Sequence, residues 1–527
     1  MSLIRIITYQ TYLLQQENYE LKRFLKAVWV KTINFKSLTF RQEIVWTNKL
    51  KLVTGLAFAI LIIEQIAFVN WLGSLGCILL LIKLPFLFLV FCLYLSLATL
   101  ILKPLDIWQK NKIINSGTSK LVEWKKSNPN SKIIAIAGSY GKSSVKNALE
   151  IILGQKFKVL ATTGNENTPI GISRMLNRGL NNNIEIVILE LGEYKVGDIK
   201  EMCDFFQPDI GVITGINEAH LERMGGIENT IKSIFEPAES LPNRSKIYLN
   251  QDDKRVFENY QSFCNDLKIQ FYSSINHPLS KGSNQNGLGD YQPTFNQNSL
   301  SYNGQITNGT ETQNFELNML AKYGLGLVDL GTQLGNELGM NLNEIANGIK
   351  EIKPVPHRLE LIKGQNRTIV IDDSYNGNPE GVRAAIEVLS LFKKSKPQTT
   401  VIQSEAKDPL TIENTSQQES YPFPKGSNQY SLGGSKTTVY CTPGLVEIGE
   451  SSQEVHYQLG KELASVVDIL ILVKNKNTES MAKGYGEIKP EGIIKYYESG
   501  PDLHAKFGEM LKGGEVILFQ NDLTDNY

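Results

Sequence analysis

The chain has 527 residues, enough for two or three domains, and its 54 basic residues balance its 54 acidic ones. A balanced charge gives no indication of a nucleic-acid partner. The five cysteines are scattered without the spacing of a zinc site or a disulfide framework, so the sequence favours a reducing, cytoplasmic location for the soluble part.

Residues 1–115 are predicted to form a membrane anchor. Two apolar runs, 52–72 and 75–102, are each long enough for a transmembrane helix. Nine Lys or Arg residues precede them and further lysines follow, which places both ends on the cytoplasmic side. A buried hairpin in a soluble domain is the alternative. The role of Glu64, inside the first run, stays open: it is either a functional intramembrane acid or part of a helix contact.

The most informative local motif follows a strand-like segment, residues 132–137, and leads into a helix-like segment. It consists of Gly138, Ser139, Tyr140, Gly141, Lys142, Ser143 and Ser144. Glycines let the backbone close around a phosphate, and N–H groups at the helix start point at the anion. Lys142 supplies a positive charge, and the hydroxyl of Ser143 or Ser144 can ligate Mg²⁺. The loop is shorter than the common Walker pattern, and a tight turn without function is the alternative.

Residues 116–350 are predicted to form a domain around a mostly parallel sheet, because strand-like and helix-like segments alternate. The strand-like segments lie near residues 132–137, 158–162, 184–190, 210–214 and 246–250. Ligands of such sheets gather at the carboxyl ends of the strands. The phosphate loop, Glu190 and Thr214 all fall at such ends.

Residues 351–527 are predicted to form a second, smaller α/β domain. Its strands are expected near 367–371, 437–441, 468–472 and 515–519, and its helices near 379–392, 452–464 and 503–511. Two stretches, 273–312 and 402–436, are rich in Asn, Gln, Ser and Gly and share the motif Lys-Gly-Ser-Asn-Gln-x-x-Leu-Gly. We expect both to be inserted surface loops without a catalytic role.

Four stretches in order point to one family. They are the phosphate loop, Thr163–Gly171, Glu190–Gly192 with Gly215–Glu222, and His357–Glu360 with Asp372–Pro379. Over about residues 130–527 the chain resembles the Mur ligases, ATP-dependent enzymes that form amide bonds in cell-wall synthesis. It looks closest to the branch that adds D-alanyl-D-alanine to the UDP-N-acetylmuramoyl tripeptide. The resemblance implies a central P-loop parallel-sheet ATPase domain and a smaller C-terminal Rossmann-like α/β domain, here preceded by two transmembrane helices.

The resemblance also implies ATP and Mg²⁺ as cofactors and an acyl phosphate intermediate. Lys142 would hold the β- and γ-phosphates, while Ser143 or Ser144 would bind Mg²⁺ with Glu190 and His220. Lys142, His220 and Arg358 are the expected catalytic residues. A lone histidine such as His220 is more often structural than catalytic. Its place in the motif Glu-Ala-His-Leu-Glu, however, favours a role in the Mg²⁺ site.

At the junction of the two domains, the resemblance places Arg358 near the γ-phosphate and Asp373 near the ribose, with Asn376 in the same nucleotide-binding loop. An interdomain salt bridge is the alternative for Arg358, and an Asx-rich turn is the alternative for the loop. Asn165 and Thr168 match positions where the family contacts its acceptor substrate.

Three departures from the family are visible. Ile234 stands where the family usually has a carbamylated lysine for a second Mg²⁺, with Glu236 at the following acid and Lys232 two residues early. Tyr323-Gly-Leu-Gly-Leu327 replaces a His-Asn-x-x-Asn stretch that contacts adenine. The membrane hairpin replaces the N-terminal UDP-sugar-binding domain, which suggests an acceptor presented at the membrane.

We therefore expect an ATP-dependent ligase at the inner membrane, with its catalytic domains facing the cytoplasm. Its partners would be a muropeptide acceptor, UDP- or lipid-linked, an amino-acid or dipeptide donor, and other cell-wall enzymes, but no nucleic acid. The alternative is a membrane-tethered nucleotide-binding scaffold for cell-wall enzymes that has lost catalysis. A P-loop NTPase that performs mechanical work fits poorly, because no strand ends in paired acids before an arginine-finger segment.

Overall fold

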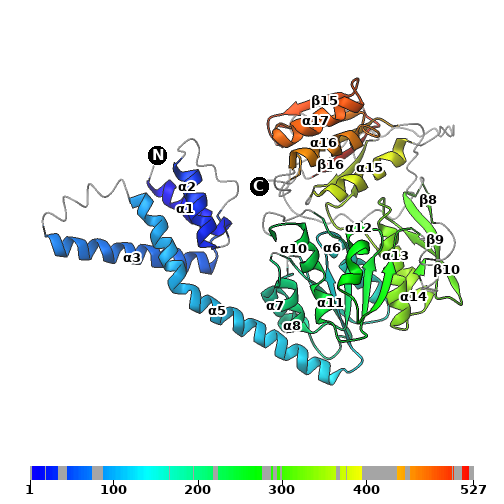
Figure 1. Cartoon of the computed structure of the whole chain (residues 1–527), viewed down its shortest axis with the longest axis horizontal. Coiled ribbons are helices and arrows are strands. Elements are labelled where there is room, and N and C mark those ends of the chain that lie inside the picture. The colour runs from blue at the N-terminus through cyan, green and yellow to red at the C-terminus, as the bar shows by residue number, and fades with distance from the viewer. Residues whose placement is uncertain are drawn as a thin grey trace, which may run out of the picture. The chain divides into compact units, whose positions relative to one another are not determined.

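The structure, a computed structural model, describes most of the chain. The described residues are 3–17, 19–33, 44–73, 87–164, 166–193, 195–217, 224–275, 287–288, 293–296, 299–363, 368–374, 377–393, 436–445, 452–500, 502–503 and 513–520. The chain divides into two compact units, residues 1–116 and 117–524, and the boundary falls inside a long helix. Figure 1 shows the first unit in blue and the second in cyan to red.

The first unit is helical. Its elements are α1 (Leu3–Gln16), α2 (Leu21–Ile33), α3 (Asn48–Leu72) and the first part of α5 (Leu87–Ser127). Side chains of all four helices form one buried cluster, in which Leu13, Phe24 and Phe91 are almost completely buried. Apolar residues further along α3 are instead exposed, for example Ile63 at 66% and Trp71 at 81%. Exposed apolar rows of this kind suit a lipid environment.

Two described helices, α3 and residues Phe91–Ser127 of α5, are long and apolar enough to cross a membrane by length and composition. The beginning of the predicted second run, 75–102, lies outside the described residues, and its helix extends beyond residue 102. Within the described residues its helix begins at Leu87 and continues past Pro104 to Ser127. The proline does not end the helix, whose sequence on both sides is rich in good helix formers. Residues 74–86 lie outside the described part.

Glu64 takes part in a contact between two helices. The hydroxyl of Tyr94 on α5 donates a hydrogen bond of 3.0 Å to the Glu64 carboxylate on α3. A polar group in an apolar helix is costly unless it has a partner. The structure therefore gives Glu64 the role of a helix contact.

In the second unit, a six-stranded parallel sheet forms the first layer, as predicted from the alternation of strands and helices. Its strand order is β2-β3-β1-β4-β5-β6. The strands are β1 (Lys132–Ala137), β2 (Val159–Ala161), β3 (Ile186–Glu190), β4 (Ile210–Ile213), β5 (Lys246–Asn250) and β6 (Lys268–Tyr272). Because β1 lies between β3 and β4, the loop after β1 emerges beside the ends of both neighbours.

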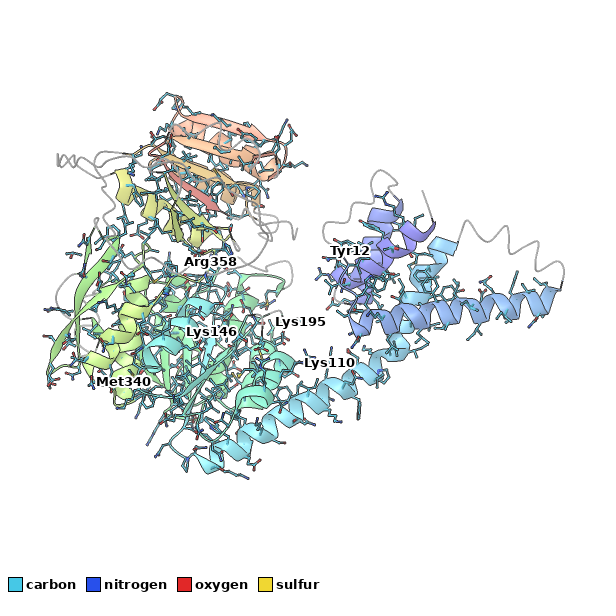
Figure 2. All side chains as sticks on the ribbon, turned by 180° about the vertical axis from the view of Figure 1, so that it is seen from behind. Tyr12, Lys110, Lys146, Lys195, Met340 and Arg358 are labelled. Atoms are coloured by element: carbon cyan, nitrogen blue, oxygen red, sulfur yellow. The ribbon has the colours of Figure 1, made fainter. Side chains whose placement is uncertain are left out.

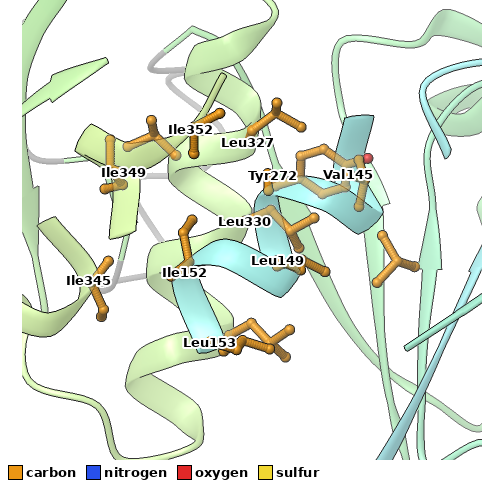
Figure 3. Close-up of a cluster of buried hydrophobic side chains, with 14 of the residues drawn as sticks. Val145, Leu149, Ile152, Leu153, Tyr272, Leu327, Leu330, Ile345, Ile349 and Ile352 are labelled. Carbon is orange, nitrogen blue, oxygen red and sulfur yellow. The ribbon is translucent and has the colours of Figure 1, made fainter. Parts of the chain in front are cut away.

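Helices cover the faces of this sheet and connect its strands. They are α6 (Lys142–Leu153), α7 (Pro169–Gly179), α8 (Asp198–Phe206), α10 (Ile227–Ile234), α11 (Glu236–Ser240), α12 (Lys254–Asn259), α13 (Gly324–Glu337) and α14 (Leu342–Glu351), with a 3-10 turn at Tyr260–Ser262. The helix after the phosphate loop is buried at Val145, Leu149 and Ile152, the spacing of one helix face. Figure 3 shows this face of α6 packed against apolar side chains of α13 and α14. This packing fixes the start of α6.

A small antiparallel sheet corrects part of one prediction. The stretch 273–312 was expected to be a loop, yet β9 (Ser301–Thr307) pairs there with β10 (Thr312–Leu317) and with the short strands β7 (Gly287–Leu288) and β8 (Thr294–Asn296). In β9 the buried positions include Ser301, Tyr302, Gly304 and Ile306. Small and polar residues among the buried ones hide the alternation that marks a strand.

The C-terminal part contains a separate six-stranded sheet, here called the C-terminal sheet, with the order β11-β12-β16-β13-β14-β15. Its strands are β11 (Glu360–Lys363), β12 (Ile369–Asp373), β13 (Thr438–Thr442), β14 (Ile469–Val473), β15 (Ile493–Tyr497) and β16 (Val516–Gln520). Only β11 among these described strands runs antiparallel to its neighbour.

Three helices pack with the C-terminal sheet around a shared apolar core: α15 (Pro379–Lys393), α16 (Ser452–Leu463) and α17 (Lys476–Ile488). The sequence did not predict α17 or β15. The predicted helix 503–511 and loop 402–436 lie largely outside the described residues.

Candidate functional site

The phosphate loop joins β1 to α6 and is shaped by two glycines. Gly138 has a φ of 151° and Gly141 a φ of 81°, a region that side chains rarely adopt. A Cβ atom on Gly138 would also collide with the Thr214 hydroxyl at the end of β4. The Ser139 N–H donates a 2.7 Å hydrogen bond to the Gly215 carbonyl. The loop is therefore held in one conformation against the segment that follows β4.

Lys142, the first residue of α6, has a partner that the sequence analysis did not single out. Its ammonium group lies 2.8 Å from the Glu193 carboxylate and also donates to the Gly138 carbonyl. The side chains of Lys142 and Glu193 are only 13% and 4% exposed. The only signal in the sequence was the position of Glu193, three residues after Glu190 beyond the same strand.

Ser143 and Glu190 form the second pair of the site. The Ser143 hydroxyl lies 3.0 Å from both carboxylate oxygens of Glu190, which is 5% exposed at the end of β3. The Glu190 N–H donates a 3.0 Å hydrogen bond to the Thr162 hydroxyl, and this bond fixes the end of the strand. A hydroxyl beside a buried carboxylate supplies the hard oxygen donors that Mg²⁺ prefers, so these residues fit that ion.

Tyr140 supports the loop from the other side. Its hydroxyl donates a 2.6 Å hydrogen bond to Asp253, the N-cap residue of α12, and its ring leaves no room for a side chain at Gly215. Burial, followed by the charge of Asp253, raises the pKa of Tyr140. Tyr140 therefore stays neutral, and its contacts with Asp253 and Gly215 support the phosphate loop. The buried hydroxyl of Ser139 has no hydrogen-bond partner among the described residues, as suits a loop that binds an anion.

Two residues of the C-terminal part come near the phosphate loop. The Tyr323 hydroxyl lies near the Ser144 side chain and within electrostatic range of both Arg358 and Asp373. Arg358 lies just before β11, the first strand of the C-terminal sheet, and Figure 2 labels it together with Lys146 of α6. Lys146 is buried and donates to the Thr162 carbonyl at 2.7 Å. Ser144, Arg358 and Asp373, which are far apart in the sequence, thus all lie within electrostatic range of Tyr323.

Asp373 is held at the end of β12 by two donors. The Leu359 N–H lies 3.3 Å from one of its oxygens, and the Gln520 amide lies 2.8 Å from the other. Burial raises the pKa of Asp373 to about 7, and the nearby positive charge of Arg358 only partly opposes this effect. Asp373 is only 4% exposed. It therefore changes charge near neutral pH, beside Arg358.

This raised pKa predicts a pH-dependent stability. Because the pKa of Asp373 is about 7 in the folded protein and 3.8 in the unfolded chain, the folded state holds the proton more tightly between these values. The stability contributed at this residue falls as the pH rises through that window. We expect the melting temperature of wild type, relative to Asp373→Asn, to fall as the pH rises from about 4 to about 7. The measurement is thermal unfolding of the full chain in detergent at a series of pH values. A melting-temperature difference between the two proteins that does not change with pH would contradict the raised pKa of Asp373.

Three predicted site residues, His220, Asn165 and Asn376, lie outside the described residues. Thr168 is described, and its hydroxyl accepts a 3.2 Å hydrogen bond from Gly171 N–H as the N-cap of α7. Its backbone position is therefore fixed by the helix start. The capping bond explains a serine-like residue at this place without any ligand.

The structure accounts for the departure at Ile234. This side chain is completely buried in the apolar core of α10, and Lys232 on the same helix is exposed. Glu236 is buried and accepts backbone hydrogen bonds from Gly197 at 2.6 Å and Lys200 at 2.8 Å. Burial raises the pKa of Glu236. The Glu236 carboxylate therefore caps the N-terminus of α8. The exposed Lys232 does not take the place of a buried lysine.

Gly324, the first residue of α13, is closely packed. A Cβ atom there would lie 2.9 Å from Leu317 Cδ2 and 3.1 Å from Met319 Sδ. Restoring an asparagine at this place would therefore require its neighbours to move. The Tyr323 side chain, one residue earlier, is the polar group that this segment presents near Ser144.

Comparison with known proteins identifies relatives of this part of the chain. Residues 136–319 match the family described as the Mur ligase middle domain. A UDP-N-acetylmuramoyl-tripeptide–D-alanyl-D-alanine ligase of Escherichia coli is 28% identical over 298 residues, which cover 56% of this chain and 63% of the relative. The enzyme of the same name from Rickettsia prowazekii is 29% identical over 299 residues, covering 55% and 64%. The chain thus spans less than two thirds of these relatives.

Solved structures share the fold. MurF from Acinetobacter baumannii superposes with a TM-score of 0.59 at 20% identity, covering 79% of this chain and 78% of its own. MurF ligase from Thermotoga maritima in complex with ADP has a TM-score of 0.58 at 19% identity, covering 79% and 81%. These similarities establish the α/β fold with its parallel sheet, as the sequence predicted.

Proposed function

Because this chain contains a Mur ligase middle domain and belongs to the Mur ligase family, we propose that it is an ATP-dependent ligase that forms an amide bond on a peptidoglycan precursor. The observation that carries the proposal is that Lys142 and the Ser143–Glu190 pair lie at the phosphate loop, while Arg358 and Asp373 lie within electrostatic range of Tyr323. A cation, a set of oxygen ligands and a second cation are what phosphoryl transfer requires around the transferring group.

In this proposal each residue has one task. Lys142 leaves Glu193 and binds the β- and γ-phosphates, and Arg358 neutralises charge on the transferring phosphoryl group. Ser143 and Glu190 would hold Mg²⁺, with His220 and Ser144 as further candidates, and the bound ion would neutralise phosphate charge. The ionised form of Asp373 accepts hydrogen bonds from the ribose, with Asn376 nearby in the same loop. A substrate carboxylate takes the phosphoryl group, and an amine then attacks the acyl phosphate and releases phosphate.

The names of the relatives suggest the substrates. The proteins from Escherichia coli and Rickettsia prowazekii are named for joining D-alanyl-D-alanine to a UDP-N-acetylmuramoyl tripeptide. We assign this chain the same dipeptide donor and a muropeptide acceptor, UDP- or lipid-linked. Asn165 and Thr168, at the loop before α7, are the residues we assign to the acceptor.

The N-terminal unit supplies a location. Residues 1–115 would anchor the chain in the inner membrane through the two apolar helices, with the catalytic domains facing the cytoplasm. We assign residues 116–350 to the ATP-binding domain and 351–527 to the C-terminal domain. Such an anchor would keep the enzyme beside membrane-bound precursors and other cell-wall enzymes. A scaffold without catalysis is not favoured, since Lys142, Glu190, Arg358 and Asp373 are all retained.

The test is substrate-dependent release of ADP. Full-length protein in detergent would be supplied with ATP, Mg²⁺, D-alanyl-D-alanine and either a UDP-linked or a lipid-linked tripeptide. We expect ADP and an equal amount of ligated product only when acceptor, dipeptide and Mg²⁺ are all present. Reactions without acceptor and reactions with chelator are the controls. Nucleotide binding without turnover on either acceptor would contradict the ligase and support the scaffold.

A further inference from the structure

We propose that Glu193 is a metal-binding carboxylate of the nucleotide site, kept neutralised by Lys142 until a nucleotide and its divalent cation bind. This assignment rests on the proposed function, because it concerns the same site. It adds a residue that no motif indicated and gives it two successive partners. The residue would make nucleotide affinity unusually dependent on the divalent cation.

The first support is the burial of Glu193. Its side chain is 4% exposed, and one of its oxygens lies 2.8 Å from the Lys142 ammonium, across 51 positions in the sequence. Lys142 is the counter-ion of Glu193 among the described residues, and a buried carboxylate left without its counter-ion strongly destabilises a protein. Whatever takes Lys142 away from Glu193 must therefore leave another cation in its place.

The second support is that a phosphate would compete for the same lysine. Lys142 begins α6 immediately after the glycine loop, where backbone N–H groups and the ammonium would bind an anion. Its ammonium already donates to the Gly138 carbonyl and to Glu193. A nucleotide phosphate at this lysine adds negative charge directly beside Glu193, so the two repel each other unless a cation lies between them.

The third support is the charge and the chemistry of the neighbours. Glu190 is the last residue of β3 and Glu193 lies three residues further on, and Ser143 binds Glu190 while the adjacent Lys142 binds Glu193. The second lysine of α6, Lys146, donates to the Thr162 carbonyl. The two lysines of α6 thus equal the two glutamates in number before any phosphate arrives. Phosphates would make the site strongly negative, and the available oxygens of Ser143, Glu190 and Glu193 form a donor set for a hard divalent cation.

The proposal predicts opposite effects of Glu193 with and without metal. Without a divalent cation, Glu193 competes with phosphate for Lys142, so Glu193→Gln should bind ADP more tightly than wild type. With the cation, Glu193→Gln should lose a ligand. We therefore expect the gain in ADP affinity on adding Mn²⁺ to be about 10- to 100-fold smaller in Glu193→Gln, the range for losing a metal partner.

The experiment measures ADP dissociation constants of the full chain in detergent, with chelator and with Mn²⁺, and bound Mn²⁺ by electron paramagnetic resonance. Glu337→Gln is the matched control, since it removes a carboxylate 2.9 Å from Lys246 in the same unit. Its metal dependence should equal that of wild type. Glu193→Asp, which keeps the charge on a shorter side chain, should give an intermediate value and guards against a folding defect in Glu193→Gln.

Two results would overturn the assignment. If Glu193→Gln binds ADP more tightly without metal but keeps the full gain from Mn²⁺, Glu193 serves only to hold Lys142. If Glu193→Asp and Glu193→Gln both match wild type in every measurement, Glu193 has no part in the site. Failure of the wild type to bind ADP under any condition would instead contradict the proposed function itself, and with it this assignment.

Discussion

Replacing Lys142 with alanine is expected to lower the rate of ADP release by about 100- to 1,000-fold, the usual loss when one charge-stabilising donor is removed from an active site. Lys142 is the cation at the start of α6, and the structure places it where a phosphate would bind. The measurement is initial ADP release by full-length protein with ATP, Mg²⁺, acceptor and dipeptide. Retention of more than about a tenth of the wild-type rate would contradict the role.

This substitution needs two controls because it also leaves Glu193 without its partner. The first is the double variant Lys142→Ala with Glu193→Gln, in which no buried charge remains unpaired. It should melt close to the wild-type temperature and still release ADP no faster than Lys142→Ala. The second is Lys158→Ala, an exposed lysine of the same unit, which should keep the wild-type rate. A slow Lys158→Ala would indicate a general effect of removing charge.

Replacing Ile234 with lysine is expected to destabilise the protein by about 3 to 5 kcal/mol, the cost of an uncompensated buried charge. Ile234 is completely buried with Ile231 and Phe235 in the apolar core beside α10. The nearby Glu236 carboxylate does not offer a free partner, because it accepts backbone hydrogen bonds from Gly197 and Lys200. Restoring the residue that the family uses here should therefore weaken the fold instead of improving the site.

The measurement is urea unfolding of full-length protein in detergent, followed by circular dichroism. Ile234→Met is the matched control, since an apolar exchange of similar volume costs less than about 1.5 kcal/mol. We expect the midpoint of Ile234→Lys to fall well below that of Ile234→Met. A lysine variant as stable as the methionine variant would show that a counter-ion reaches position 234, and would reopen the question of a second metal there.

Much of the local structure could be predicted from the sequence, because it depends on neighbouring residues. Alternating segments predicted the parallel sheet, and the glycines at 138 and 141 predicted a loop whose φ angles are positive at both. The apolar run at 52–72 predicted α3 almost to its ends. The strand β9 was missed, because its buried residues include small and polar ones that do not show the usual alternation.

The sequence by itself determined the order of strand, glycine loop and helix, and it identified Glu190 as an acid at the end of an apolar strand. Only the tertiary structure decided which side chains meet. Because β1 lies between β3 and β4, the loop after β1 meets Glu190 and Glu193 on one side and Thr214 on the other. The pairing of Lys142 with Glu193 depends on this strand order, which no local pattern encodes. For the same reason the burial of Ile234 and the capping of α8 by Glu236 became clear only from the packed structure.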